Sequence, residues 1–277
     1  MRGLSYILIV LILTNCTVAQ DSNTQPQKVK DLLEKVKKHN PERYKFAFDK
    51  GAKVFQTADG NSFYVLWYPP DVKADKTLIV TMHGSLSYAF DEFYLWFEKA
   101  KKHGHGILAL QWWFEGNPPP RDYYFPNESY RAIDLALKQE QLKPQKALFH
   151  GFSRASANSY YVALFDRESK NNYFLLNLAN SGGASENYPM YRDVVAEKFG
   201  KTPLAGTNWA TFCGYFNQNP ERDGCPAMRR TGEFIEKYGG EVKLAIEDEK
   251  GDHGLFHKNP QLVDKALDLF DDMLKKQ

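Results

Sequence analysis

Short apolar runs alternate with amphipathic stretches along most of the chain. The runs are compact and rich in branched and aromatic residues, as expected for strands buried on both faces; they span residues 77–82, 107–110, 147–149, 174–178, 209–216 and 242–246. Between them, apolar residues recur at helical spacing, for example within 90–101, 130–139, 228–238 and after Asn259-Pro260. This alternation predicts an α/β fold with a mostly parallel central sheet and helices on both faces.

The first part of the chain departs from that alternation. Residues 53–57 and 63–68 read as two strands around the turn signal Asp59-Gly60, which predicts an antiparallel hairpin. Before them, an apolar stripe within 29–36 predicts a short helix that ends at Asn40-Pro41. We therefore expect a leader at 1–19, an N-terminal extension with a short helix at 20–50, and one large domain at 51–277.

The leader has the features of a secretory signal peptide. Arg2 precedes an apolar run at 6–13, and Thr17-Val18-Ala19 offers small residues for cleavage. The run is short for a membrane span, although an N-terminal anchor is an alternative. The segment Leu13-Thr14-Asn15-Cys16 resembles a bacterial lipoprotein box, in which Asn15 is unusual, so lipidation of Cys16 is a second alternative. All of these place the mature protein outside the cytoplasm, secreted or periplasmic.

Export changes the expectation for the cysteines. Cys16 leaves with the leader or carries lipid, and Cys213 and Cys225 remain as a pair in an oxidising compartment. We predict a disulfide between them, with a stabilising effect of about 3 kcal/mol for a loop of this length. Two buried free thiols are the alternative.

Composition narrows the classes of function. The formal net charge of +2 and the lack of a long basic run argue against a nucleic-acid partner. The histidines are scattered along the chain, so we expect neither a metal nor a cofactor.

The segment 146–156, Lys-Ala-Leu-Phe-His-Gly-Phe-Ser-Arg-Ala-Ser, passes from an apolar strand through Gly-x-Ser-x-small into a helical pattern. A serine on a strained strand-to-helix turn needs small residues two positions on either side, which Gly151 and Ala155 provide. Here the chain resembles the α/β-hydrolases, with Ala155 in place of the commoner glycine. The resemblance implies that Ser153 is a nucleophile; a helix N-cap serine is the alternative.

Two more polar residues follow later strands in the order expected of that family. Asp223 follows the strand at 209–216, and His253 follows the last strand between two glycines. The resemblance implies a Ser153, Asp223, His253 triad in which His253 moves the proton and Asp223 holds the imidazole. The alternatives are Glu221 or Asp252 as the acid, His257 as the base, and Asp223 as a simple turn residue.

Backbone amides are expected to complete the site. The strand at 77–82 ends in His83-Gly84-Ser85-Leu86, and in the resembled family such a turn supplies one oxyanion donor. By position, Ser85 or Leu86 provides that amide and Arg154 the other, whereas His83 is structural.

The loop at 111–125 is aromatic to an unusual degree. We predict that it lines an acyl or sugar-ring pocket, with packing under a long loop as the alternative; the candidate substrate-binding residues are Trp112, Trp113, Tyr123 and Tyr124.

Gly-Phe-Ser-Arg is similar over four residues to the elbow of glucuronoyl esterases, and a cation at Arg154 suits an anionic substrate or the oxyanion. A solvated arginine on the first turn of a helix is the alternative.

Together these features predict an exported serine hydrolase that cleaves a small-molecule or glycan ester through an acyl-enzyme. A serine peptidase of the same fold and a catalytically inactive binding protein on this scaffold are the alternatives.

Overall fold

A computed structural model describes residues 26–72, 75–186 and 188–277 of the chain. The predicted leader at 1–19 and the candidate lipidation site Cys16 lie outside the described residues. Within those residues, no helix has the length and apolar character needed to cross a membrane.

The described residues contain an eight-stranded sheet with the order β1-β2-β4-β3-β5-β6-β7-β8. The β2 strand pairs antiparallel with β1 and β4, and every other pairing is parallel. This confirms the predicted fold class. The strands are β1 (Lys53–Gln56), β2 (Phe63–Trp67), β3 (Leu78–Met82), β4 (Gly106–Leu110), β5 (Ala147–Phe152), β6 (Phe174–Asn180), β7 (Asn208–Phe216) and β8 (Glu241–Asp252).

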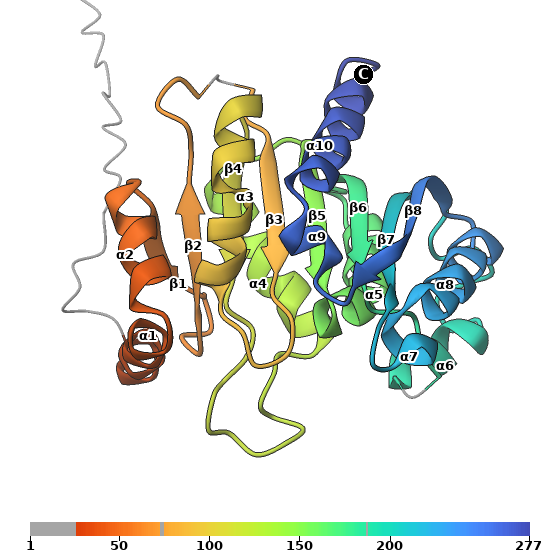
Figure 1. The fold of residues 1–277 in the computed structure, drawn as a ribbon, viewed down its shortest axis with the longest axis horizontal. Helices are drawn as coiled ribbons and strands as arrows, with labels where there is room; N and C mark the ends of the chain where they lie inside the picture. Colours follow the sequence, from red (N-terminus) through yellow and green to blue (C-terminus); the bar gives the residue numbers. More distant parts are fainter. Residues whose placement is uncertain (1–25, 73–74, 187) are drawn as a thin grey trace, which may run out of the picture.

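Helices cover both faces of the sheet (Figure 1). On one face lie α3 (Ala89–His103), α9 (Leu255–Lys258) and α10 (Pro260–Leu274), whose buried side chains join those of α1 (Gln27–His39) and α2 (Pro41–Asp49) in one cluster. On the other face lie α4 (Pro126–Gln139), α5 (Arg154–Glu168) and α8 (Cys225–Lys237). The short helices α6 (Pro189–Val195) and α7 (Pro220–Asp223) lie near α8 at one end of the sheet.

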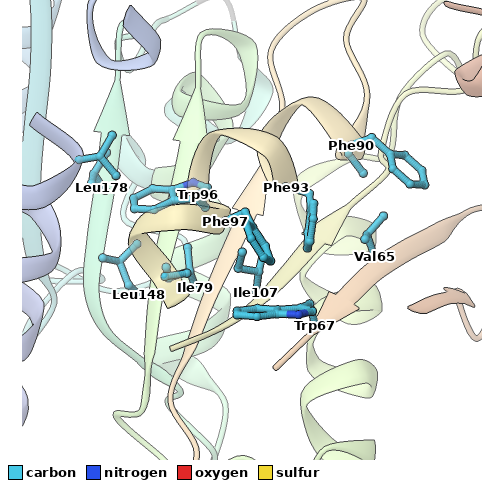
Figure 2. Close-up of a cluster of buried hydrophobic side chains, with 14 of the residues drawn as sticks. Val65, Trp67, Ile79, Phe90, Phe93, Trp96, Phe97, Ile107, Leu148 and Leu178 are labelled. Carbon is cyan, nitrogen blue, oxygen red and sulfur yellow. The ribbon is translucent and has the colours of Figure 1, made fainter. Parts of the chain in front are cut away.

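The helix α3 fixes the first of these faces. Its residues Phe93, Trp96 and Phe97 are buried against strand residues such as Ile79 and Ile107 (Figure 2). Burying an aromatic side chain of this size stabilises a fold by about 1.5–3 kcal/mol, so this contact anchors the helix firmly to the strands. The sheet is therefore a rigid support for the polar residues that lie at the ends of its strands.

The N-terminal segment differs from the sequence prediction at Asn40-Pro41. This pair ends α1 as expected, but it also begins a second helix, α2, because the Asn40 side chain accepts a hydrogen bond from the Arg43 backbone N–H at 3.1 Å. Asparagine before proline at the first helical position is a strong helix-start signal. The buried stripe of α1, formed by Val29, Leu32 and Val36, packs into the main core cluster.

The last strand is longer than its apolar run predicts. β8 continues to Asp252, through a charged stretch, because it is the edge strand and its side chains are alternately exposed and half-buried. Its pairing with β7 is irregular near Gly214, where a Cβ atom would lie 2.3 Å from the Gly251 carbonyl carbon. The extension carries the chain directly to His253.

Candidate active site

Ser153 lies on a sharp turn between β5 and α5. Its backbone has φ of 54°, a conformation that costs energy for a residue with a side chain. The turn is tightly enclosed: a Cβ atom on Gly151 would lie 2.6 Å from the Ala155 carbonyl oxygen, and one on Gly182 would lie 2.0 Å from that of Ser153. The small residues that the sequence pattern required are therefore needed for close backbone approach.

The structure brings His253 to Ser153 from 100 positions along the chain. The His253 Nε2 atom lies 2.9 Å from the Ser153 Oγ atom, which is hydrogen-bond distance. Burial lowers the pKa of His253 below its ordinary value, and the negative charge of Asp223 opposes that shift only in part. The imidazole is therefore neutral at neutral pH, as a proton acceptor must be.

The other nitrogen of this imidazole faces an amide. The Asn217 side-chain nitrogen lies 2.9 Å from His253 Nδ1, while the Asn217 side-chain oxygen accepts from the Asn219 backbone N–H at 3.0 Å. Which end of the amide faces the ring follows from the hydrogen-bond network, because oxygen and nitrogen are alike in shape. Sequence reasoning passed over Asn217, although it is the first residue after β7.

Asp223, the predicted acid, lies nearby on α7. Its side chain is buried apart from a small fraction, and one carboxylate oxygen accepts from the Arg222 guanidinium at 2.7 and 2.5 Å. Among the charges around His253, Asp223 has the largest pKa-raising effect. Its role as the acid of a triad stays a prediction, because the atom at hydrogen-bond distance from Nδ1 belongs to Asn217.

The alternative acids and base have other partners. Glu221 pairs with Arg230 at 2.6 Å, and the Asp252 carboxylate accepts from the Gly254 backbone N–H at 2.9 Å. His257 lies 3.1 Å from a carboxylate oxygen of Glu92. Each of these side chains is thus engaged away from Ser153 Oγ.

The turn after β3 approaches the same site. Ser85 lines a cavity of about 300 Å³ together with Ser153 and Arg154, and Arg154 is the first residue of α5. The Leu86 backbone N–H already donates to the Tyr123 hydroxyl at 3.0 Å. Oxyanion roles for the amides of Ser85, Leu86 and Arg154 stay predictions, and that of Leu86 requires Tyr123 to release this bond.

His83, in the same turn, behaves as a structural residue. It is fully buried, and burial lowers its pKa to about 4. Its Nδ1 atom lies 2.8 Å from the Gly84 carbonyl oxygen, so the neutral ring donates a hydrogen bond to the turn.

The aromatic loop forms part of a cavity of about 490 Å³ next to the site. Trp112, Tyr123, Tyr124 and Arg154 are among its lining residues. Trp112 is 1% exposed and donates from its indole nitrogen to the His83 carbonyl oxygen at 2.8 Å, so it also supports the turn after β3. Trp113 packs against Tyr88 and Tyr123 and lies outside that lining. Substrate binding by these four aromatics stays a prediction.

A buried polar network lies behind the elbow. The Glu92 carboxylate, on α3, lies 3.1 Å from His257 Nε2 and 3.4 Å from His150 Nδ1. Burial acts to raise the pKa of Glu92, but the two histidines outweigh it and hold the pKa well below its usual range. His257 packs on the ring of Phe152, 4.2 Å between centroids, so this network supports the residue that precedes Ser153. Its members come from α3, β5 and α9, and no local pattern in the sequence marks them.

The predicted disulfide between Cys213 and Cys225 is present and confirms that pairing, with the two Cα atoms 5.1 Å apart. It joins β7 to the start of α8 and closes the loop that carries Asn217 and Asp223. The bond therefore restrains the loop that carries these two side chains.

One group of potential metal ligands occurs in the described residues. Ligand atoms of His103, His105 and Asp271 all lie within 4.8 Å of one another, at the amino-terminal end of β4 and away from Ser153. The two imidazoles are 2.7 and 3.1 Å from the carboxylate oxygens of Asp271, which are hydrogen-bond distances between α3, the β4 entry and α10.

The sequence matches no protein-family model and no curated protein sequence. The structure is nevertheless similar to solved esterases. A hyperthermophilic esterase from the archaeon Pyrobaculum calidifontis has a TM-score of 0.60 and 11% identity over 89% of this chain and 93% of that one. A fungal esterase from Rhizomucor miehei gives 0.61 and 13%, over 88% and 90%.

A third structure, an esterase/lipase from an uncultured bacterium, has a TM-score of 0.56 and 12% identity, and covers 90% of this chain and 98% of that one. The similarity therefore extends over nearly the whole length of each protein. The chain has the α/β-hydrolase fold, in the form that these esterases share.

Proposed function

We propose that this protein is a serine hydrolase that cleaves carboxylic esters. The observation that carries the proposal is the 2.9 Å distance between Ser153 Oγ, on the strained turn, and the Nε2 atom of a neutral His253. A hydroxyl is a poor nucleophile at neutral pH and needs an adjacent base. The similar solved structures are those of esterases, which supports an ester rather than an amide as the substrate.

In the proposed reaction, His253 Nε2 accepts the Ser153 proton while Oγ attacks the ester carbonyl carbon. The negative charge that develops on the carbonyl oxygen is stabilised by backbone amides of Ser85 and Arg154. His253 then donates its proton to the departing alkoxide, and the acyl group stays on Ser153. Water, deprotonated by the same imidazole, attacks the acyl-enzyme and releases the carboxylic acid.

Two side chains serve the imidazole in different ways. Asn217 contacts Nδ1 and fixes the plane of the ring. With its oxygen turned toward Nδ1, it accepts a hydrogen bond from Nδ1–H and so selects the tautomer in which Nε2 is the base. Asp223 has no such contact, but its charge raises the pKa of His253 and so stabilises the imidazolium that forms in the reaction.

We also propose that the protein works outside the cytoplasm, secreted or periplasmic. The disulfide between Cys213 and Cys225 supports this, since such bonds persist in oxidising compartments. The leader at 1–19 supports it from the sequence, with a lipid on Cys16 as the alternative form of export.

Hydrolysis of 4-nitrophenyl acetate tests the catalytic assignment. Ser153→Ala and His253→Ala should each reduce kcat by at least about 10³-fold, because each removes one half of the nucleophile–base pair. Glu221→Gln serves as a folded control with the activity of the wild type, since this exposed side chain forms an ion pair with Arg230 and has no contact with His253 among the described residues. Full activity in either Ala variant contradicts the assignment.

A second candidate function, a non-catalytic binding protein on this scaffold, is favoured by one observation. The amide nitrogen of Asn217 faces His253 Nδ1, and that orientation selects the tautomer with the proton on Nε2, which cannot accept the serine proton. The two candidate functions predict different activities for the wild type. If the protein only binds its ligand, the wild type should hydrolyse no aryl ester faster than the Ser153→Ala variant does.

A further inference from the structure

The Arg154 guanidinium lies where two cavities beside Ser153 meet. Arg154 lines both the 300 Å³ cavity that contains Ser153 and the 490 Å³ cavity formed by the aromatic loop. Because it is partly buried and not fully solvated, its charge acts on whatever enters these cavities more strongly than a surface arginine does.

This guanidinium is held in place by a ring and not by a carboxylate. Its central carbon lies 3.9 Å from the centroid of the Tyr123 ring, which is a cation–π arrangement. Across the described part of the chain, Arg154 forms no ion pair and its guanidinium donates no hydrogen bond, whereas Arg121, Arg222 and Arg230 each pair with a carboxylate. The five N–H donors of Arg154 are thus available to a ligand.

The charges that line the cavity with Ser153 favour the binding of an anion. Besides Arg154, the charged residues that line the cavity with Ser153 are Arg222 and Asp223, which form an ion pair at 2.5 Å and together add no net charge. Arg154 therefore gives the cavity a net positive charge. The other cavity is lined mainly by apolar and aromatic side chains, among them Trp112, Phe125 and Met190.

We propose that Arg154 binds a free carboxylate on the substrate, so that the ester that this protein cleaves is an anionic one with an apolar body seated among the loop aromatics. A planar guanidinium stacked by one face on Tyr123 leaves its edge for a two-point contact with a carboxylate. The inference deepens the proposed esterase function and rests on it, since it names the class of ester.

A matched pair of esters tests this inference. Mono(4-nitrophenyl) glutarate and 4-nitrophenyl pentanoate have the same leaving group and similar chain length, and 3-acetoxybenzoate and phenyl acetate place the charge on the leaving group instead. The wild type should favour the anionic member of at least one pair in kcat/KM by about 10-fold or more. Arg154→Gln should remove that preference, and Arg131→Gln, an exposed arginine on α4 outside both cavities, should keep it.

Two outcomes overturn the inference: no preference for either anionic ester, or an equal loss in Arg154→Gln for the anionic and neutral members. The second outcome would assign the guanidinium to the oxyanion. If the wild type cleaves no ester at all, the proposed function fails separately, and binding decides the inference. By calorimetry, 4-phenylbutyrate should then bind the wild type about 10-fold more tightly than 4-phenylbutanamide and lose this advantage in Arg154→Gln; equal affinities overturn it.

Discussion

Replacing Asn217 by Asp is the most informative change in the site. A carboxylate has two acceptor oxygens, so the side chain introduced by Asn217→Asp can accept from the Asn219 backbone N–H with one and from His253 Nδ1–H with the other. The Asn217 amide has a single oxygen, which can face only one of these two partners at a time. We therefore expect Asn217→Asp to fix the tautomer of His253 in which Nε2 is the base.

The size of the effect follows from the contact distance. A neutral hydrogen bond contributes about 1 kcal/mol, and one to a charged group contributes about 1.5–3 kcal/mol. At 2.9 Å from Nδ1, the new charge should stabilise the imidazolium in the transition state by a further 1 kcal/mol or more, roughly. Since about 1.4 kcal/mol is a factor of ten in rate, kcat should rise by about 5-fold or more.

The assay is the pH dependence of kcat and kcat/KM for 4-nitrophenyl acetate between about pH 5 and 9. Burial holds the pKa of His253 below the ordinary value in the wild type, and a nearby anion raises it. Because the neutral ring is the active form, Asn217→Asp should move the acid limb to higher pH while the plateau rises. Gln218→Glu adds the same charge to the same loop without the contact to Nδ1 and should produce a smaller shift.

An unchanged or lower plateau in a folded Asn217→Asp protein, with the acid limb where the wild type has it, would refute this reasoning. It would mean that Asn217 does not control the proton on His253 and that another group, with Asp223 the first candidate, holds the ring in the reactive state.

Three further predictions concern the frame of the site. Replacing both Cys213 and Cys225 by Ala should lower the free energy of unfolding by about 3 kcal/mol, measured by urea denaturation. The same change should lower kcat, because the loop that carries Asn217 becomes more mobile. Unchanged stability would contradict the structural role of the bond. Gly182→Ala should reduce activity and stability, because its Cβ atom would lie 2.0 Å from the Ser153 carbonyl oxygen. Gly232→Ala should be tolerated, because the nearest atom to its Cβ would be 4.0 Å away. Equal effects of the two substitutions would contradict the close backbone packing around Ser153. The wild-type profile of kcat/KM should fall only below the ordinary histidine pKa of 6.5, since burial lowers that of His253; a fall that begins above 6.5 contradicts this.

The features that sequence predicts well here are those set by local pattern. Apolar runs such as 77–82 and 147–149 are buried on both faces and leave a clear signal, and the turn at Ser153 requires small residues at fixed offsets. The pairing of Cys213 with Cys225 followed from the compartment and the count alone. The edge strand β8 is longer than predicted because its exposed half is charged and needs no apolar run.

The remaining parts of the site depend on contacts between distant elements. Asn217 lies in a polar loop where any of several residues has suitable chemistry, and only the path of β7 and β8 brings it to His253. Glu92 reads as one acidic residue on an amphipathic helix, yet it is 1% exposed and meets two histidines from other elements. Such positions carry no local signature because their partners are fixed by packing.

The central claim is that the Ser153 hydroxyl is activated by His253. Labelling of the native protein with a fluorophosphonate, followed by peptide mass spectrometry, measures this directly, because the reagent reacts with activated serines and spares ordinary ones. We predict stoichiometric labelling at Ser153 that is lost in His253→Ala and after heat denaturation. Absence of label on Ser153 in the folded wild type, or equal labelling in His253→Ala, would contradict the account.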